Sequence, residues 1–359
     1  MQQEINVVFS YYLTSPFYRA TWQALRLFRK KRKIVLYCDD ALDAVLFRNV
    51  QKHLNPVQIV AKNRQVRKKL KALGCFSRLM PSFPDAVIMF RNTAWKFPCK
   101  KIIKIGFDHG AYNFKRFSKA HYYNRFDAYF MSSEAEVVRA KKRGITTVRT
   151  IGFPKIDPVF DGSINPRQLR DLAFRIGLDP KKKTLLFSST WDGSGMSAIH
   201  KWHDRISSLK DRYNLMVTVH TWMSEMYRME LKKNPDIVFI DDYEILQYIM
   251  IADVCIGDTN SLLAEFCLLD KPIITFRVPV TERTMPDVIE LIEKISVRID
   301  AFEELAPAVE RLFKNGDDFS AQRKEAVKIT LGEPDGKAGL RAADEIIKLL
   351  PELRPAQPA

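Results

Sequence analysis

At 359 residues the chain is long enough for two domains, and its hydrophobic content of 46% allows a sizeable core. The five cysteines show no metal-binding spacing, which argues against a zinc site and a disulfide scaffold and is typical of a reducing cytoplasm. No run approaches the roughly 18 apolar residues of a membrane helix, and the chain does not open on a signal peptide, so we expect a cytoplasmic protein.

Positive charge is concentrated in the first part of the chain. Residues 1–150 contain 30 Lys and Arg against 9 Asp and Glu, whereas the remainder contains 28 against 33. Each basic cluster, at 26–33, 62–71 and 139–144, can be a solvated helix face, but together they favour an anionic partner. We expect an anionic membrane surface or a phosphorylated acceptor. Nucleic acid is not expected, because no helix-turn-helix, zinc-finger or RNA-binding signature accompanies the charge.

Short apolar runs alternate with helical stretches along the first part of the chain. The pattern predicts helices at about 17–31, 40–53 and 134–144. It predicts strands at 5–12, 33–38, 57–61, 85–90, 101–107, 126–133 and 147–153.

A linker-like stretch at 161–166 precedes a second set of alternating elements. Strands are predicted at 183–190, 215–220, 237–241, 253–258 and 272–276. Helices are predicted at 167–176, 199–213, 224–233, 243–252, 261–269, 300–313, 320–330 and 337–350. Such alternation indicates parallel sheets with helices on both faces, and ligands bind at the carboxyl ends of the strands in folds of this kind.

Polar residues follow several of the predicted strands. His109 lies just after a strand in the first half, and His220 ends a strand in the second half. A lone histidine in such a place is usually structural, but two of them facing one cleft favour a functional reading. Serine, threonine and glycine follow other strands at 188–195 and 257–261, where helix N-termini favour phosphate. Neither a Walker A motif nor GxGxxG is present, so an ordinary nucleotide hydrolase or dinucleotide enzyme is not expected.

Five segments resemble the CDP-glycerol glycerophosphotransferases, the family of teichoic-acid primases and polymerases. They are FDHG at 107–110, IGFPKIDPVF at 151–160, LLFSSTW at 185–191, VTVH at 217–220 and the stretch 241–276. The similarity spans about residues 101–276. It implies a GT-B fold, in which two facing Rossmann-like doubly wound α/β domains bind nucleotide mainly in the second.

The resemblance implies three domain segments. Residues 1–160 would form the domain on the acceptor and membrane side, and 161–335 the domain that binds the nucleotide donor. Residues 336–359 would form a C-terminal helix and tail that pack back on the first domain.

The resemblance also implies site residues. His109 and His220 would be catalytic, and Lys115 stands one residue later than the lysine of the family. The interdomain motif comprises Gly152, Pro154, Lys155 and Asp157. Residues expected to bind the donor or its phosphates are Gly110, Ser189, Thr190, Asp258, Thr259, Asn260, Ser261 and Glu265. Asp258 can instead cap a helix or orient a neighbour, and Glu265 can be an ordinary helix-face carboxylate.

The implied reaction moves glycerol phosphate from CDP-glycerol, or a similar polyol phosphate from another nucleotide-activated donor. An acceptor hydroxyl attacks the β-phosphorus, His109 takes the proton, and CMP leaves. His220 would bind or protonate the diphosphate. The acceptor would be a lipid-linked or polysaccharide chain at the inner face of the cell membrane, with the enzyme held there peripherally. No cofactor and no protein-bound metal are expected.

Two other functions remain open. One is a GT-B glycosyltransferase that uses a nucleotide-sugar donor to make capsule or lipopolysaccharide. The other is a non-catalytic protein that binds anionic polymers, although the presence of both His109 and His220 argues against it.

Overall fold

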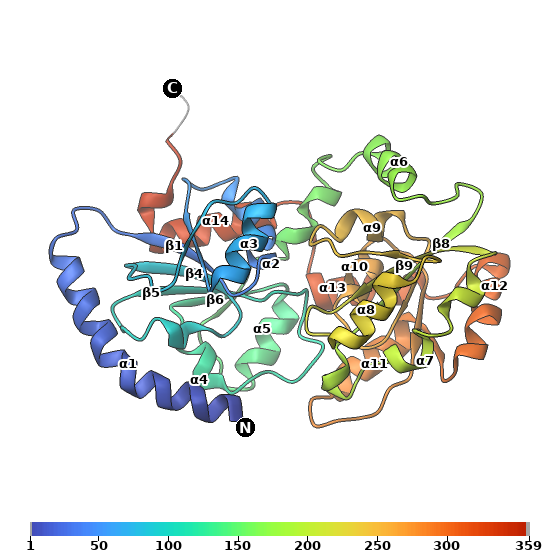
Figure 1. The fold of residues 1–359 in the computed structure, drawn as a ribbon, viewed down its shortest axis with the longest axis horizontal. Coiled ribbons are helices and arrows are strands. Elements are labelled where there is room, and N and C mark those ends of the chain that lie inside the picture. The colour runs from blue at the N-terminus through green and yellow to red at the C-terminus, as the bar shows by residue number, and fades with distance from the viewer. Residues whose placement is uncertain (1, 357–359) are drawn as a thin grey trace. The chain divides into compact units, whose positions relative to one another are not determined.

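The computed structural model describes residues 2–356, which form two compact units (Figure 1). The first unit comprises Met1–His109, Ser118–Asp157 and Pro334–Ala359. The second comprises Gly110–Phe117 and Pro158–Glu333. Residues 110–117, which the sequence analysis assigned to the first domain, therefore belong to the second unit.

The first unit contains a parallel sheet in the order β3-β2-β1-β4-β5-β6-β7. Its central strands are buried on both faces, so they appear in the sequence as continuous apolar runs. The strands are β1 (Ile34–Cys38), β2 (Gln58–Ala61), β3 (Ser77–Leu79), β4 (Ala86–Phe90), β5 (Ile103–Phe107), β6 (Ala128–Met131) and β7 (Val148–Thr150).

Four helices of the first unit, α2 to α5, connect consecutive strands as in a doubly wound fold. Ser133 caps α5 by accepting a hydrogen bond from the N–H of Glu136, as its place before the helix predicts. The helices are α1 (Gln2–Leu27), α2 (Leu42–Gln51), α3 (Arg64–Ala72), α4 (Ala120–Tyr123), α5 (Glu134–Lys141) and α14 (Ala338–Leu349).

The first element of the chain corrects one prediction. Residues 5–12 lie inside α1, so the strand predicted there is wrong. Contacts made further along α1 show what holds the helix: Tyr18 donates to the carbonyl of Ser82 at 2.7 Å, and the indole N–H of Trp22 donates to that of Pro84 at 2.6 Å. An apolar run of eight residues cannot by itself tell a strand from part of a helix, and these distant partners are invisible in the local pattern.

The second unit contains a parallel sheet in the order β10-β9-β8-β11-β12-β13. Its strands cover a core centred on Phe187, Trp202 and Phe276, all fully buried. The strands are β8 (Lys183–Ser189), β9 (Tyr213–Val219), β10 (Val238–Phe239), β11 (Val254–Gly257), β12 (Ile273–Phe276) and β13 (Val297–Ile299).

The helix predicted at 199–213 is much shorter than expected. Only Ile199–Trp202 is α-helical (α7), Ile206–Leu209 is a 3-10 turn, and Tyr213 already begins β9. The other helices of the unit are α6 (Pro166–Arg175), α8 (Glu225–Lys233), α9 (Leu246–Ile251), α10 (Leu262–Leu268), α11 (Pro286–Ile295), α12 (Leu305–Asn315) and α13 (Ser320–Leu331). Both α11 and β13 were missed by the sequence analysis.

Each sheet has a point where the strand order reverses. In the first unit β1 has β2 on one side and β4 on the other; in the second, β8 has β9 on one side and β11 on the other. Neighbouring connections leave such a switch point on opposite faces of the sheet, which opens a crevice at the carboxyl ends of the strands. The strand order therefore places one switch point in each unit.

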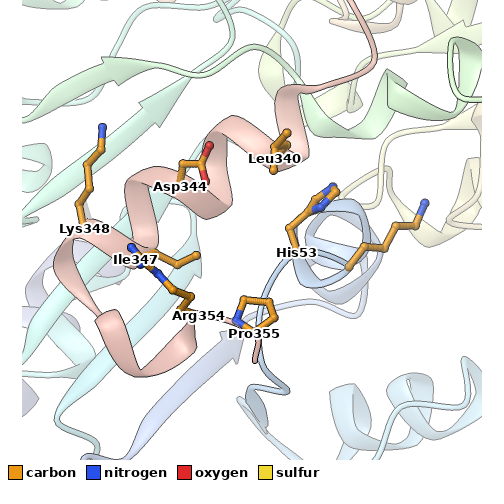
Figure 2. Close-up of a pocket in the computed structure, with 8 residues that line it drawn as sticks. His53, Leu340, Asp344, Ile347, Lys348, Arg354 and Pro355 are labelled. Carbon is orange, nitrogen blue, oxygen red and sulfur yellow. The ribbon is translucent and has the colours of Figure 1, made fainter. Parts of the chain in front are cut away.

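The C-terminal helix belongs to the first unit and packs on α2, as the red and blue ribbons of Figure 1 show. Gly339 makes this approach possible, because a Cβ there would lie 2.5 Å from the carbonyl oxygen of Asn49. An open groove of about 630 Å³ lies beside the two helices, lined by Lys52, His53, Leu340, Asp344, Ile347, Lys348, Arg354 and Pro355 (Figure 2). It borders the C-terminal end of α2, away from the carboxyl ends of the strands.

None of the helices among residues 2–356 combines the length and the apolar content needed to cross a membrane.

Candidate active site

Asp258 organises the switch point of the second unit. The residue follows β11, is fully buried, and accepts a hydrogen bond from the hydroxyl of Ser189 at 2.5 Å. Its carboxylate also accepts from three backbone N–H groups, those of Thr190 at 3.0 Å, Ala198 at 3.0 Å and Thr259 at 2.6 Å. Burial raises the pKa of Asp258, and these donors oppose that shift. The carboxylate thus fixes the loop after β8 against the loop after β11.

Lys115 reaches the same place from the segment 110–117. Its ammonium donates to the hydroxyl of Thr190 at 2.5 Å. Burial lowers the pKa of Lys115 to about 8, with Asp258 opposing the shift and Arg283 adding to it. Lys115 is half-buried, and its ammonium has three N–H donors, so it can donate to an anion as well as to the neutral hydroxyl of Thr190. Its position in the sequence alone assigned no role to Lys115.

His220 follows β9 at the same edge of the sheet. Its Nδ1 accepts a hydrogen bond from the backbone N–H of Trp222 at 3.1 Å. A neutral imidazole with an accepting Nδ1 carries its proton on Nε2, so His220 can donate from Nε2 to a ligand. The backbone N–H of His220 also bonds the carbonyl of Ser189 at 3.2 Å, which ties the histidine to the loop after β8.

The turn after β11 holds the remaining donor-site candidates. The hydroxyl of Thr259 donates to the carbonyl of Met196 at 3.2 Å, and the amide of Asn260 donates to that of Ser188 at 3.3 Å. Ser261 begins α10 and makes no side-chain capping bond. Gly110 lies against it, because a Cβ on Gly110 would come within 2.8 Å of the hydroxyl oxygen of Ser261.

Glu265 lies one turn further along α10 and is buried. Trp191 and Trp222, which the sequence analysis did not single out, have ring centroids 5.7 Å apart, and the guanidinium of Arg283 lies 5.6 Å from the ring of Trp191. Trp222 is 58% exposed, so part of its indole can contact a ligand.

His109 belongs to the first unit and is exposed after β5. Its neighbour Asp108 accepts a hydrogen bond from the hydroxyl of Tyr129 at 2.8 Å. Gly110, the next residue in the chain, belongs to the second unit. The structure therefore gathers His220, Lys115 and the serine, threonine and aspartate candidates in the second unit, while His109 stands at the edge of the other sheet.

The motif at 152–157 anchors the C-terminal helix within the first unit. Asp157 accepts from the N–H groups of Ala338 at 3.2 Å and Gly339 at 2.7 Å, which caps α14. Gly152 has φ of 87°, and a Cβ there would lie 2.9 Å from that of Ala338. The carbonyl of Pro154, which is buried, accepts from the amide of Asn49 at 2.8 Å. Lys155, the fourth motif residue, is half-buried in the same 3-10 turn.

No group of three or more His, Cys, Asp or Glu within residues 2–356 is arranged to hold a metal ion.

Comparison with known proteins places these features in a family. Residues 99–348 match the family described as CDP-Glycerol:Poly(glycerophosphate) glycerophosphotransferase. The teichoic acid ribitol-phosphate polymerase TarL of Staphylococcus aureus is 22% identical over 236 residues, covering 59% of this chain and 41% of TarL. The teichoic acid glycerol-phosphate primase of Bacillus subtilis is 28% identical over 169 residues, covering 45% of this chain and 42% of the primase. The chain thus spans less than half the length of these relatives.

Solved structures show the same fold. A variant of the wall teichoic acid polymerase TagF superposes with a TM-score of 0.73 at 13% identity, covering 98% of both chains. The S. aureus MnaA-UDP co-structure matches less well, with a TM-score of 0.59 at 13% identity, covering 92% of this chain and 100% of MnaA. The α/β GT-B class predicted from the sequence is confirmed. The family match covers residues 99–348, which is more than half of the chain. The chain therefore belongs to the CDP-glycerol:poly(glycerophosphate) glycerophosphotransferase family.

Proposed function

We propose that the protein transfers glycerol phosphate, or a similar polyol phosphate, from a CDP-activated donor to a hydroxyl of a lipid-linked or polysaccharide acceptor. The observation that carries the proposal is the switch point of the second unit, where Asp258 fixes two loops and Lys115 supplies a cation. Family membership supports a CDP-polyol donor, and one TagF structure was obtained with CDPG.

The donor diphosphate would occupy the edge beside Lys115, Thr190 and His220. The ammonium of Lys115 neutralises charge on the diphosphate, and Nε2 of His220 donates a hydrogen bond to it. Glu265 is placed on α10 to accept a hydrogen bond from a ribose hydroxyl. Asp258 does not touch the phosphates in this scheme, because its oxygens already accept from Ser189 and from backbone N–H groups.

The chemical step is a displacement at the β-phosphorus. The acceptor oxygen forms a bond to this phosphorus, and the bond from the phosphorus to the bridging oxygen breaks, so that its electron pair leaves with CMP. His109 takes the proton of the attacking hydroxyl. The peptide bond to Gly110 supports this role, because it keeps His109 one residue from a segment that packs beside Ser261 in the second unit.

Release of CMP from CDP-glycerol in the presence of a glycerol-phosphate acceptor tests the proposal. We expect His109→Ala to lose at least a hundredfold in turnover while keeping the affinity for CDP-glycerol, since a general base is worth about 10²–10⁴-fold. His220→Ala should weaken donor binding as well. Full turnover by His109→Ala would remove the base assignment, and a protein that binds UDP-sugars in preference to CDP-glycerol would favour the glycosyltransferase alternative.

Peripheral binding to an anionic membrane is part of the proposal. The end of α1 leaves Leu27 and Phe28 more than four-fifths exposed, at 84% and 87%, and the exposed Lys30 and Lys31 follow. Aromatic and basic side chains together suit the surface of an anionic bilayer, where each cation contributes about 1 kcal/mol. We expect flotation with anionic vesicles that falls as salt rises. Exchanging Lys30, Lys31 and Arg32 for glutamate should weaken it in part, because the basic clusters around Lys68 and Lys141 share the task. Equal flotation with neutral vesicles would contradict the electrostatic part.

A further inference from the structure

The switch point of the first unit carries a charged cluster that the steps above do not use. Asp39 follows β1, Lys62 follows β2, and Arg91 follows β4, so all three stand at the carboxyl edge of the sheet. Lys96 joins them from the 3-10 turn after β4. The crevice beside β1 and β4 is where an open doubly wound sheet binds its ligand.

The cluster is tightly paired. Asp39 accepts from the ammonium groups of Lys96 at 3.0 Å and Lys62 at 3.2 Å, and from the hydroxyl of Tyr37 at 3.0 Å. Burial disfavours the carboxylate, but the two lysines outweigh it and hold the pKa of Asp39 below its ordinary value. The indole of Trp95 lies 5.4 Å from the same Lys96 ammonium. Cations, a carboxylate and an aromatic ring therefore share one small surface.

A second carboxylate lies beneath this surface. Asp43 is fully buried, and its Oδ2 accepts from the backbone N–H groups of Asp39 at 2.7 Å and Asp40 at 3.1 Å. Its Oδ1 has no hydrogen-bond donor among the described residues, and the nearest cation is Nε of Arg91 at 3.8 Å. That Nε likewise lacks an acceptor within residues 2–356. Two buried polar atoms are thus left without hydrogen-bond partners at the crevice.

Arg91 is also held in an unusual backbone conformation. Its φ is 74°, a region that residues with a side chain rarely occupy, and its N–H bonds the carbonyl of Phe107 at 3.0 Å. Strained residues of this kind persist where the surrounding structure enforces them and gather at ligand sites. Arg91 therefore combines an unusual backbone conformation with a side-chain Nε that has no acceptor among the described residues.

We propose that Asp39, Lys62, Arg91, Lys96 and Trp95 form the acceptor site, and that this site recognises a phosphate group that carries neighbouring hydroxyls. The mixture of charges argues for this chemistry. Three cations suit a phosphate, while the Asp39 carboxylate repels a second phosphate and accepts from a hydroxyl. Trp95 offers an apolar face to the carbon chain of a polyol. A nucleoside diphosphate, which needs an excess of donors, fits the second unit better.

The strand order relates this site to the proposed base. β5, which His109 follows, is the neighbour of β4, so the crevice and His109 share one edge of one sheet. An acceptor whose terminal phosphate is held by Lys62 and Lys96 would extend its terminal hydroxyl along that edge. The identification of the ligand as an acceptor rests on the proposed glycerophosphotransferase function, whereas the binding chemistry does not.

Binding without any nucleotide tests the site separately from the reaction. The probes are sn-glycerol 3-phosphate and methyl phosphate, which share the phosphate and differ in the hydroxyls, titrated calorimetrically into the full chain. We expect the wild type to prefer glycerol 3-phosphate by at least fivefold. Lys62→Ala/Lys96→Gln should weaken both probes tenfold or more, and Asp39→Asn should remove the preference. Lys68→Ala, an exposed lysine of α3, is the matched control and should change neither by more than twofold.

The binding and turnover results together decide the matter. Wild-type binding that these variants leave unchanged overturns the site, as does failure of the wild type to bind either probe at millimolar concentration. Lys62→Ala alone, which removes an exposed side chain, keeps the test valid if the double variant does not fold. CMP release from CDP-glycerol by the wild type is measured in parallel. If the wild type releases CMP but does not bind the probes as predicted, only this site is rejected. If it binds the probes as predicted but releases no CMP, only the proposed donor is rejected.

Discussion

Replacing Lys115 by methionine should make the protein more stable and a poorer binder of its donor. Methionine keeps the length and the apolar stem of the side chain and removes the ammonium. Burial lowers the pKa of Lys115 from 10.5 to about 8. At about 1.4 kcal/mol per pKa unit, this difference corresponds to roughly 3 kcal/mol of unfavourable burial. Loss of the hydrogen bond to Thr190 offsets about 1 kcal/mol, which leaves a net gain of about 1–2 kcal/mol at pH 7.

The lowered pKa of Lys115 determines at which pH the charged side chain destabilises the fold. Below pH 8 both the folded and the unfolded chain carry the charge, so the cost of burying it is complete. Between pH 8 and 10.5 the folded chain releases its proton first, so the cost falls as pH rises. Urea unfolding of wild type and Lys115→Met should therefore differ most at pH 7 and converge near pH 10.5. Lys181→Met, at an exposed lysine of the same unit, should show neither effect.

Donor binding provides a second readout. A diphosphate beside Lys115 favours the charged form and returns its pKa toward the ordinary value. Binding at pH 8 should then take up about half a proton, and at pH 9 about 0.9, whereas binding at pH 6.5 takes up almost none. Calorimetry in buffers of different ionisation enthalpy measures this uptake. A wild type that binds CDP-glycerol without proton uptake, or a Lys115→Met variant that keeps the uptake, would refute the placement of the diphosphate at Lys115.

Three further substitutions test other parts of the fold. Asp258→Asn replaces an acceptor by a donor opposite backbone N–H groups, so we expect a loss of about 2–4 kcal/mol in urea unfolding together with loss of donor binding. Asp157→Ala removes the cap of α14 and should cost about 1–2 kcal/mol, seen as faster amide exchange in that helix. Gly110→Ala should lower turnover by crowding the Ser261 hydroxyl at 2.8 Å. Adding Ser261→Gly should restore part of that loss, and a purely additive double variant would contradict the contact.

Buried strands were the part of the fold that could be read most directly from the sequence. The strand β4 (Ala86–Phe90) is buried at every position, so its sequence is one uninterrupted apolar run. The strands β11 and β12 are also buried at every position, although β12 includes the polar Thr275. Because a parallel sheet is covered on both faces, the composition of each strand carries the signal by itself. The order of the strands carries no such local signal, and it becomes known only from the structure.

The failures have a common physical cause, which is that distant partners decide the outcome. The helix α1 is anchored through Tyr18 and Trp22 to carbonyls more than 60 residues away, and nothing in residues 5–12 reports those partners. Lys115 meets Thr190 75 residues further along the chain. A sequence pattern identifies the edge at which such residues emerge, and tertiary contacts determine their role.

Asp258 illustrates how the structure narrows an open alternative. The sequence allowed a helix cap, an orienting group or an acceptor for a donor hydroxyl. Its oxygens meet donors from segments around 189–198 and 259, which makes it an orienting group in the described structure. A carboxylate that faces a bound phosphate weakens its binding by repulsion. A carboxylate that instead holds the phosphate-binding loop in place supports binding. The role assigned to Asp258 follows from this distinction.

The two units apply one physical device at their switch points. In the second unit the buried Asp258 holds the loop after β8; in the first unit the buried Asp43 holds the N–H groups of Asp39 and Asp40 after β1. Burial raises the pKa of both carboxyls, to about 7 for Asp43, so each ionised form is maintained at a cost to folding. A loop fixed in this way is ordered before any ligand arrives, and binding then loses less free energy to ordering. Burying each carboxylate lowers the free energy of unfolding, whereas the ordered loop raises ligand affinity. Conservative changes at Asp43 or Asp258 should therefore affect affinity even where the protein still folds.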